Sequence, residues 1–364
     1  MPAARAAVVP AAGGEFYIPS LDGIRAVSFL IVFVAHAGLD GLVPGGFGVT
    51  VFFFLSGYLI TTLLRREYAR HGAISYQNFY IRRILRIFPP YYLVLSVATL
   101  LTLAGVLRGE LAPGPVAAQL AYCYNYFVAF AGWDGVARGT GIYWSLAVEE
   151  HFYLVFPFVY ALLQRSVPSR HGQFALLLAA CAAVLAWRCV LVYLLGAAEE
   201  RTYVATDTRI DSILFGCALA VLGNPVLDRP GAPAPRWVLA AVPLALAALL
   251  VSFAYRDAQF RETFRYTLQG LALMPLFIVA IRYPSAPPFA LLNVRWVRFL
   301  GVLSYSLYLV HQVYLFALGE WLGWHPLPQG ALALALAIAT AAALYYAVER
   351  PCARLRRRLL AAVA

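Results

Sequence analysis

The amino-acid sequence predicts an all-α, polytopic integral membrane protein, a bundle of about ten transmembrane helices with both termini in the cytoplasm. Of its 364 residues, 62% are hydrophobic and 12% are charged, whereas a soluble domain typically carries about 25% charged residues. Apolar stretches of roughly 17–22 residues recur along the chain, and each is long enough to cross a hydrocarbon core about 30 Å thick. Arginine is concentrated between alternate stretches, as expected of cytoplasmic loops.

The expected spans follow one another along most of the chain. They lie near 23–40, 47–64, 89–107, 142–163, 173–196, 209–223, 237–254, 264–281, 299–318 and 329–348. The arginine-rich segments fall on one side of this arrangement, which the positive-inside rule assigns to the cytoplasm. These segments are 65–88, 164–172, 224–236, 282–298 and the C-terminal tail.

One further apolar segment, 116–132, contains Tyr and Asn and could form an eleventh span or a re-entrant piece. We predict that it does not cross, since a crossing would move the arginine-rich tail to the outer side, against the positive-inside rule. We expect the whole chain to consist of a disordered cytoplasmic start at 1–15, one transmembrane domain at 16–352 and a basic cytoplasmic tail at 353–364.

Composition also argues against several classes of protein. The net charge of +11 is explained by cytoplasmic loops, and no basic stretch is interleaved with base-stacking aromatics, so nucleic-acid binding is not expected. The five cysteines are scattered without a C-x-x-C spacing, which predicts neither a metal site nor a disulfide framework. The start of the chain lacks the pattern of a signal peptide, so the first apolar run should remain as a membrane helix.

The first span, LDGIRAVSFLIVFVAHAG, carries Arg25 and His36. Eleven residues are close to three helical turns, so both side chains are expected on one face, about 16 Å apart along the axis. We interpret His36 as a general base, because imidazole titrates near neutral pH; the alternative is a hydrogen bond between packed helices. Arg25 could equally be a boundary residue whose charge reaches the cytoplasmic surface.

The segment SYQNFYIRRILRIFPPYY places three arginines just before the third span. Arg83 and Arg86 would share a helix face, and Pro89 and Pro90 are expected in the first helical turn. Arg82, Arg83 and Arg86 are either ordinary cytoplasmic charge or a site for phosphates, which arginine binds through paired, charge-assisted hydrogen bonds.

Further polar side chains occur in spans four, six and nine. Glu149 and Glu150 enter span four about 10 Å from the outer surface, at a depth similar to that of His36. Two adjacent carboxylates inside an apolar helix are hard to explain by packing, and Glu149 could orient His36 as a carboxylate does in a hydrolase triad.

On the outer side, Asp207, Arg209 and Asp211 open span six and His311 lies in span nine. All four could line the acceptor side. The alternatives are an interfacial salt-bridge cluster for the first three and helix packing for His311. Arg188, in the middle of span five, has no partner that the sequence indicates.

Taken in order, these motifs resemble the bacterial acyltransferase 3 family of membrane O-acyltransferases, over residues 16–352. The motifs are LDGIRAVSFLIVFVAHAG, FFFLSGYLI, RRILRIFPPYY, YWSLAVEEHFY, TDTRIDSILFG, GVLSYSLYLVHQ and the closing VERP. The family's Arg-x10-His motif falls on Arg25 and His36, and its Arg-x-x-Arg motif on Arg83 and Arg86. Its acidic motif matches Glu149 and Glu150.

The resemblance implies transfer of an acyl group, usually acetyl, from cytoplasmic acyl-coenzyme A to a carbohydrate hydroxyl. It implies a multi-pass protein of the bacterial cytoplasmic membrane, with acyl-coenzyme A as a co-substrate and no further cofactor. Acceptors in the family are surface polysaccharides, lipopolysaccharide, peptidoglycan and glycosylated metabolites. Many relatives carry a C-terminal esterase-like domain, whereas this chain resembles the stand-alone members, so a separate partner protein could complete transfer beyond the membrane.

In the expected mechanism, Arg82, Arg83 and Arg86 hold the donor phosphates and Arg25 guides the thioester arm inward. His36 then either activates the acceptor hydroxyl or is itself acylated first, and the spacing does not choose between these routes. The rival function is a transporter or flippase of a lipid-linked or acylated substrate, since intramembrane charges also mark transport pathways. A transporter often shows inverted repeats, and none is evident in this sequence.

Overall fold

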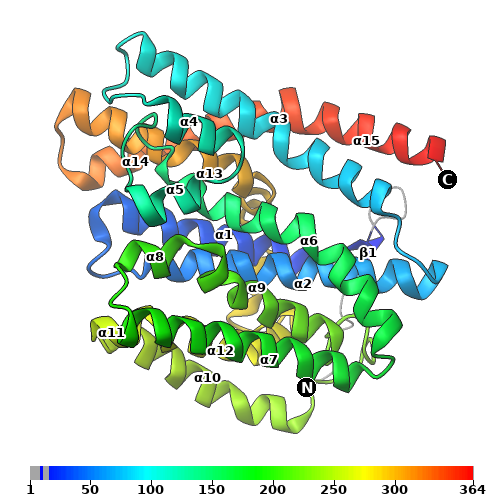
Figure 1. The fold of residues 1–364 in the computed structure, drawn as a ribbon. Coiled ribbons are helices and arrows are strands. Elements are labelled where there is room, and N and C mark those ends of the chain that lie inside the picture. The colour runs from blue at the N-terminus through cyan, green and yellow to red at the C-terminus, as the bar shows by residue number, and fades with distance from the viewer. Residues whose placement is uncertain (1–8, 11–15, 364) are drawn as a thin grey trace. The chain divides into compact units, whose positions relative to one another are not determined.

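A computed structural model describes residues 9–10 and 16–363, which are almost entirely helical (Figure 1). Nine helices in this part of the chain are long and apolar enough to cross a membrane. They span Pro19–Leu39, Gly45–His71, Tyr76–Leu103, Gly141–Ser166, Arg170–Leu194, Arg236–Ala254, Phe264–Arg282, Arg295–Leu322 and Pro326–Ala361. The predicted disordered start, 1–15, lies outside the described residues except for strand β1 (Val9–Pro10), which pairs antiparallel with β2 (Phe16–Tyr17).

The chain forms two compact units. Unit 1 holds the residues up to 28, with 46–74 and 148–301; unit 2 holds 29–45, 75–147 and the residues from 302. Helices α1 (Pro19–Val34), α6 (Trp144–Ser166) and α13 (Arg295–Leu322) each contribute several residues to both units.

Unit 1 is built around α2 (Gly45–His71) and four later helices. These are α7 (Arg170–Cys189), α9 (Thr206–Val221), α10 (Arg236–Ala254) and α12 (Phe264–Arg282). The shorter elements are η3 (Val190–Leu194), α8 (Glu199–Val204), α11 (Ala258–Glu262) and η4 (Phe289–Asn293). Helix α9 packs against α7 and α12, and α10 packs against α12.

Glycine allows α2 and α9 to approach closely in unit 1. A Cβ atom at Gly57 would lie 2.0 Å from the Ile213 carbonyl oxygen, and one at Gly216 would lie 2.0 Å from that of Phe54. Only a hydrogen at these positions lets the two backbones meet, which is how small residues commonly act in membrane helix packing.

The span predicted near 209–223 corresponds to α9, which has only 16 residues. At 1.5 Å per residue it is about 24 Å long, shorter than a hydrocarbon core of about 30 Å. This helix is therefore not among the nine candidates, and the count of ten spans remains a prediction. Its first turns carry Asp207, Arg209 and Asp211, and most of its side chains are buried.

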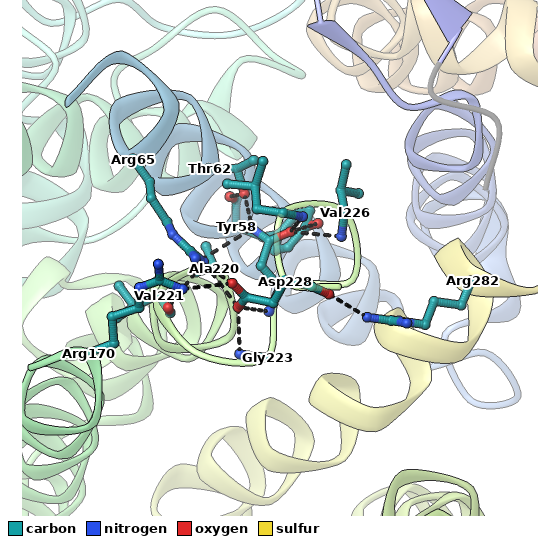
Figure 2. A network of polar contacts seen from close by, with 12 residues as sticks. Tyr58, Thr62, Arg65, Arg170, Ala220, Val221, Gly223, Val226, Asp228 and Arg282 are labelled. Atoms are coloured by element: carbon teal, nitrogen blue, oxygen red, sulfur yellow. Dashed lines mark hydrogen bonds and ion pairs between the residues drawn. The ribbon is translucent and has the colours of Figure 1, made fainter. Parts of the chain in front are cut away.

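A polar network around Asp228 connects several segments of unit 1 (Figure 2). Arg65 of α2 donates to both Asp228 oxygens and to the Ala220 and Val221 carbonyls, and Arg170 donates to Asp228 Oδ1 at 2.9 Å. Arg282 donates to the Asp228 backbone carbonyl at 2.7 Å. Burial alone would raise the pKa of Asp228, but the hydrogen bond and charge of Arg65 hold it below its usual range.

This network brings together the four internal arginine-rich segments that the sequence assigned to one side. Arg65 comes from 65–88, Arg170 from 164–172, Asp228 from 224–236 and Arg282 from 282–298. Residues of all four segments are therefore neighbours within unit 1, as expected of segments on one side. Their assignment to the cytoplasm rests on the arginine bias alone.

Unit 2 contains the remaining helices. These are η1 (Ala35–Leu39), α3 (Tyr76–Leu103), α4 (Pro113–Leu120), α5 (Tyr124–Ala131), η2 (Gly141–Tyr143), α14 (Pro326–Leu344), η5 (Tyr345–Glu349) and α15 (Arg350–Val363). Helix α15 lies along α3 (Figure 1). The ambiguous segment 116–132 falls on α4 and α5, each about 12 Å long, so neither can cross a hydrocarbon core as a single helix.

Helix α3 corrects one expected boundary. It begins at Tyr76, where Ser75 caps it by accepting a hydrogen bond from the Asn78 amide at 3.3 Å, well before the expected start near residue 89. Pro89 and Pro90 therefore lie inside the helix and not in its first turn. Hydropathy could not find this start because the first turns are polar. The helix is about 42 Å long, so part of it extends beyond the hydrocarbon core.

Candidate active site

His36 lies in a π-helical turn at the end of the first membrane helix. The regular helix α1 ends at Val34, and η1 continues it over Ala35–Leu39, where Gly38 has a φ of 95°. The backbone of Gly38 is not helical, so the chain kinks here, two residues after His36. Because a π-turn changes the helical repeat, the expected common face of Arg25 and His36 remains a prediction.

The π-turn is held in place by α14. A Cβ atom at Gly330 would lie 3.3 Å from that of Ala37, and one at Gly38 would lie 3.5 Å from Pro326. These contacts, together with the positive φ that favours glycine at residue 38, constrain the backbone immediately after His36.

His36 is paired with His311 of α13. Its Nδ1 lies 3.0 Å from His311 Nε2, and the two rings are nearly parallel, with an interplanar angle of 9°. His36 is exposed on the surface of the protein, whereas His311 is fully buried. The His311 ring contacts Phe29, which meets it edge-on with a centroid distance of 5.5 Å, and Phe33, at 6.1 Å.

Helix η2 and the first turn of α6 contact α13 beside His311. Tyr143 donates to the Leu309 carbonyl at 2.8 Å, and the Ser145 and Tyr308 hydroxyls lie 2.7 Å apart. Gly139 permits the same approach, since a Cβ atom there would lie 2.5 Å from the Val313 backbone. The turn of α13 that carries His311 is therefore braced by hydrogen bonds on its neighbouring residues.

The Arg-x-x-Arg motif lies on α3, in the same unit as the histidine pair. Arg82 is half-buried, Arg83 is buried and Arg86 is exposed. Arg86 is close enough to interact electrostatically with Glu349, the last residue of the π-turn η5. Glu349 accepts a hydrogen bond from Ser306 of α13 at 2.6 Å.

In unit 1, the acidic motif is engaged with α2. Glu149 accepts hydrogen bonds from Ser56 at 2.7 Å and from Tyr153 at 3.1 Å, and the hydroxyls of Tyr153 and Ser56 lie 3.1 Å apart. Glu150 is half-buried beside it. The predicted relation between Glu149 and His36 remains a prediction. Arg25, also in unit 1, binds Asp22 one turn earlier at 2.8 Å.

The polar residues of α9 form contacts that suit a structural role. Asp211 pairs with Arg188 at 2.7 Å, with both side chains fully buried, and Asp207 pairs with Arg201 at 2.5 Å. Arg209 donates to the Tyr203 carbonyl at 2.8 Å and lies over the Tyr266 ring, 4.0 Å from its centroid. Asp207 and Asp211 each take part in an ion pair, and a role of the three residues on the acceptor side remains a prediction.

Comparison with known sequences agrees with this arrangement of motifs. The acyltransferase 3 family, described as an acyltransferase domain, matches residues 18–346. The chain belongs to the acyltransferase 3 family. No solved structure matches the chain.

Curated relatives of this acyltransferase are O-acetyltransferases by name. A putative O-acetyltransferase of Staphylococcus aureus is 29% identical over 313 residues, covering 81% of this chain and 50% of the relative. A peptidoglycan O-acetyltransferase of Listeria monocytogenes is 27% identical over 311 residues, covering 81% and 49%. A putative peptidoglycan O-acetyltransferase of Bacillus subtilis is 30% identical over 307 residues, covering 81% and 48%. The chain thus spans about half the length of these relatives.

Within the acyltransferase, the structure joins residues that the sequence treated separately. It pairs His36 with His311, which had been assigned to the acceptor side, and it supplies Asp211 as the partner of Arg188. In the sequence, Glu349 belongs to the closing VERP motif, and the motif assigns it no role. Glu349 lies just beyond the expected span 329–348 and beside Arg350, so its place in the sequence suits an ordinary boundary charge.

Proposed function

We propose that this acyltransferase is a membrane O-acyltransferase that moves an acyl group, usually acetyl, from acyl-coenzyme A to a carbohydrate hydroxyl. The match to curated O-acetyltransferases over 81% of the chain carries the proposal. The surface-exposed histidine His36, hydrogen-bonded to a buried partner, supports the same chemistry. Peptidoglycan is the acceptor that the names of two relatives give, and other surface glycans are acceptors that the family resemblance implies.

In the proposed reaction, His36 removes the proton of the acceptor hydroxyl as its oxygen attacks the thioester carbonyl. The C–S bond of acyl-coenzyme A breaks, a C–O ester bond forms, and the proton passes from His36 to the departing thiolate. Attack by His36 itself, followed by transfer from an acyl-histidine, gives the same products and remains an alternative route. Neither route needs a metal or a further cofactor.

The donor is proposed to enter beside α3. Arg82, Arg83 and Arg86 lie on the first turns of this helix, which extends beyond the hydrocarbon core. Ser306 of α13 binds Glu349, which interacts with Arg86, and His311 follows five residues later on α13, about 7.5 Å along the axis. A thioester arm whose phosphates are held by these arginines could therefore reach the histidine pair within one unit.

We place the protein in the bacterial cytoplasmic membrane, with both termini and the Asp228 network of Figure 2 on the cytoplasmic side. The arginine bias of the loops supports this orientation. In this orientation, the arginines proposed to bind phosphate, Arg82, Arg83 and Arg86, face the side on which acyl-coenzyme A is made. A separate protein could then complete transfer to an acceptor beyond the membrane.

The function is tested by mass spectrometry of cell-wall and secreted glycans from a strain lacking the gene. We expect glycans that have lost the mass of one acyl group, and restoration of that mass by the wild-type gene but not by a His36→Gln gene. Unchanged acylation, combined with a lipid-linked glycan accumulating on one side of the membrane, would support the transporter alternative instead.

Charge reversal at Arg86 is expected to weaken acyl-coenzyme A binding at least tenfold, because paired contacts between arginine and phosphate are strong. Arg86 is exposed, but Arg86→Glu places a second carboxylate near Glu349, so the amount of folded protein is measured together with binding. Arg83 is buried, which makes Arg83→Glu a poorer test because it also costs stability.

Titration of purified variants with acyl-coenzyme A measures this effect. The matched control is Arg295→Glu, which reverses an exposed arginine in another segment assigned to the cytoplasm. If Arg86→Glu and Arg295→Glu bind the donor equally well, Arg86 serves only as cytoplasmic charge.

A further inference from the structure

The hydrogen bonds around His311 determine which of its nitrogens carries a proton. Its Nδ1 lies 2.9 Å from the Tyr308 carbonyl oxygen and 3.2 Å from that of Leu307. Carbonyl oxygens only accept hydrogen bonds, so Nδ1 must be the protonated nitrogen. His311 is fully buried among Phe29, Phe33 and Tyr308, where a neutral ring is favoured over an imidazolium. Its Nε2 therefore carries a lone pair.

The protonation of His311 on Nδ1 also determines the tautomer of His36, because the two rings are in contact. His311 Nε2 can only accept, so the 3.0 Å contact requires His36 Nδ1 to be protonated and to donate. In a neutral His36, the lone pair then lies on Nε2. The backbone of α13 thus fixes the tautomer of a histidine that lies 275 residues away in the sequence.

We propose that His311 is a positioning residue that holds His36 in the Nδ1-protonated tautomer. The Nε2 atom of His36 can then accept the proton of the acceptor hydroxyl. This inference rests on the proposed function, and it assigns to a neutral imidazole the part that a carboxylate plays in a hydrolase triad. When the Nε2 atom of His36 takes the proton, the hydrogen bond from His36 Nδ1–H to His311 Nε2 remains in place. A hydrogen bond with one charged partner is stronger than a neutral one, so His311 also stabilises the cationic form of His36 that the reaction produces.

Selective ¹⁵N labelling of histidine in the protein reconstituted into nanodiscs reads the tautomer directly. The protein has six histidines, and the spectrum of His36→Gln identifies the His36 signals by their loss. We expect wild-type His36 to be protonated on Nδ1. A His36 protonated on Nε2 would overturn the proposal, whatever the activity of the protein. This measurement on the wild type remains decisive if a His311 variant fails to fold.

Two substitutions of His311, with one control, distinguish a role in positioning His36 from a role in packing the helices. His311→Ala removes the acceptor, so we expect His36 to lose its fixed tautomer and turnover to fall about 10²-fold or more. His311→Gln can place an amide oxygen near the former Nε2 and should retain at least about ten times the turnover of His311→Ala. Phe33→Leu removes a ring contact but no hydrogen bond, and His36 should stay protonated on Nδ1.

The results distinguish this inference from the proposed function. Equal turnover of His311→Ala and wild type, or a tautomer unchanged by His311→Ala, would exclude the positioning role while leaving acyl transfer intact. Absence of acyl transfer in the wild type, with His36 protonated on Nδ1, would instead overturn the function and leave the hydrogen-bond assignment standing.

Discussion

His36→Gln is expected to lower the turnover of acyl transfer by about 10²- to 10⁴-fold, the usual contribution of a general base, or by more if His36 is an acylated nucleophile. Glutamine has a similar reach and can still donate a hydrogen bond to His311, but it cannot accept a proton near neutral pH. Folding and acyl-coenzyme A binding should therefore remain close to normal. Turnover per folded molecule, measured with labelled acetyl-coenzyme A and a soluble glycan acceptor, reports the effect.

A histidine that serves only to pack helices would behave differently. Its loss would cost roughly 1 kcal/mol of stability and leave turnover per folded molecule nearly unchanged. His151→Gln provides the matched control, because His151 lies in the half-buried part of α6 and bonds Thr206 at 2.7 Å. Retention of more than about a tenth of wild-type turnover by His36→Gln would exclude acid–base or nucleophilic chemistry at this position.

Much of the helical fold could be predicted because span length and arginine bias are local properties of the sequence. Nine of the expected spans coincide with long apolar helices, and the four internal arginine-rich segments meet at Asp228. The span expected near 209–223 remains a prediction, because α9 has only 16 residues. The expected start of the third helix was wrong, because α3 begins in a polar stretch that hydropathy does not mark.

The family motifs located His36 and Arg86, but the sequence could not show which side chains meet. His36 and His311 are 275 residues apart, and their contact depends on a π-turn and on the packing of Gly330 against that turn. Arg188 and Asp211 likewise come from different helices. Spacing along one helix predicts neighbours on that helix, whereas contacts between helices are fixed by tertiary packing that one sequence does not reveal.

Arg188→Met is expected to destabilise the protein by about 3–5 kcal/mol, because it leaves the Asp211 carboxylate buried without its counter-ion. Arg188 also donates to the Thr208 carbonyl at 2.6 Å and to the Thr263 carbonyl at 3.0 Å, so further acceptors lose their donor. The free energy of unfolding in mixed micelles measures the loss. Arg170→Met is the control, since its contact with Asp228 is largely exposed and such pairs contribute about 0–1 kcal/mol.

The double variant Arg188→Met with Asp211→Leu decides between lost pairing and lost packing. Replacing both partners of a buried ion pair by apolar groups of similar volume is often nearly neutral, so the second substitution should recover much of the lost stability. If the double variant is instead less stable than Arg188→Met alone, Asp211 must be stabilised by its remaining bonds to Thr267 and the Ser212 amide. In that case the ion pair would not be what holds α7 and α9 together, whereas recovery would assign that role to the pair.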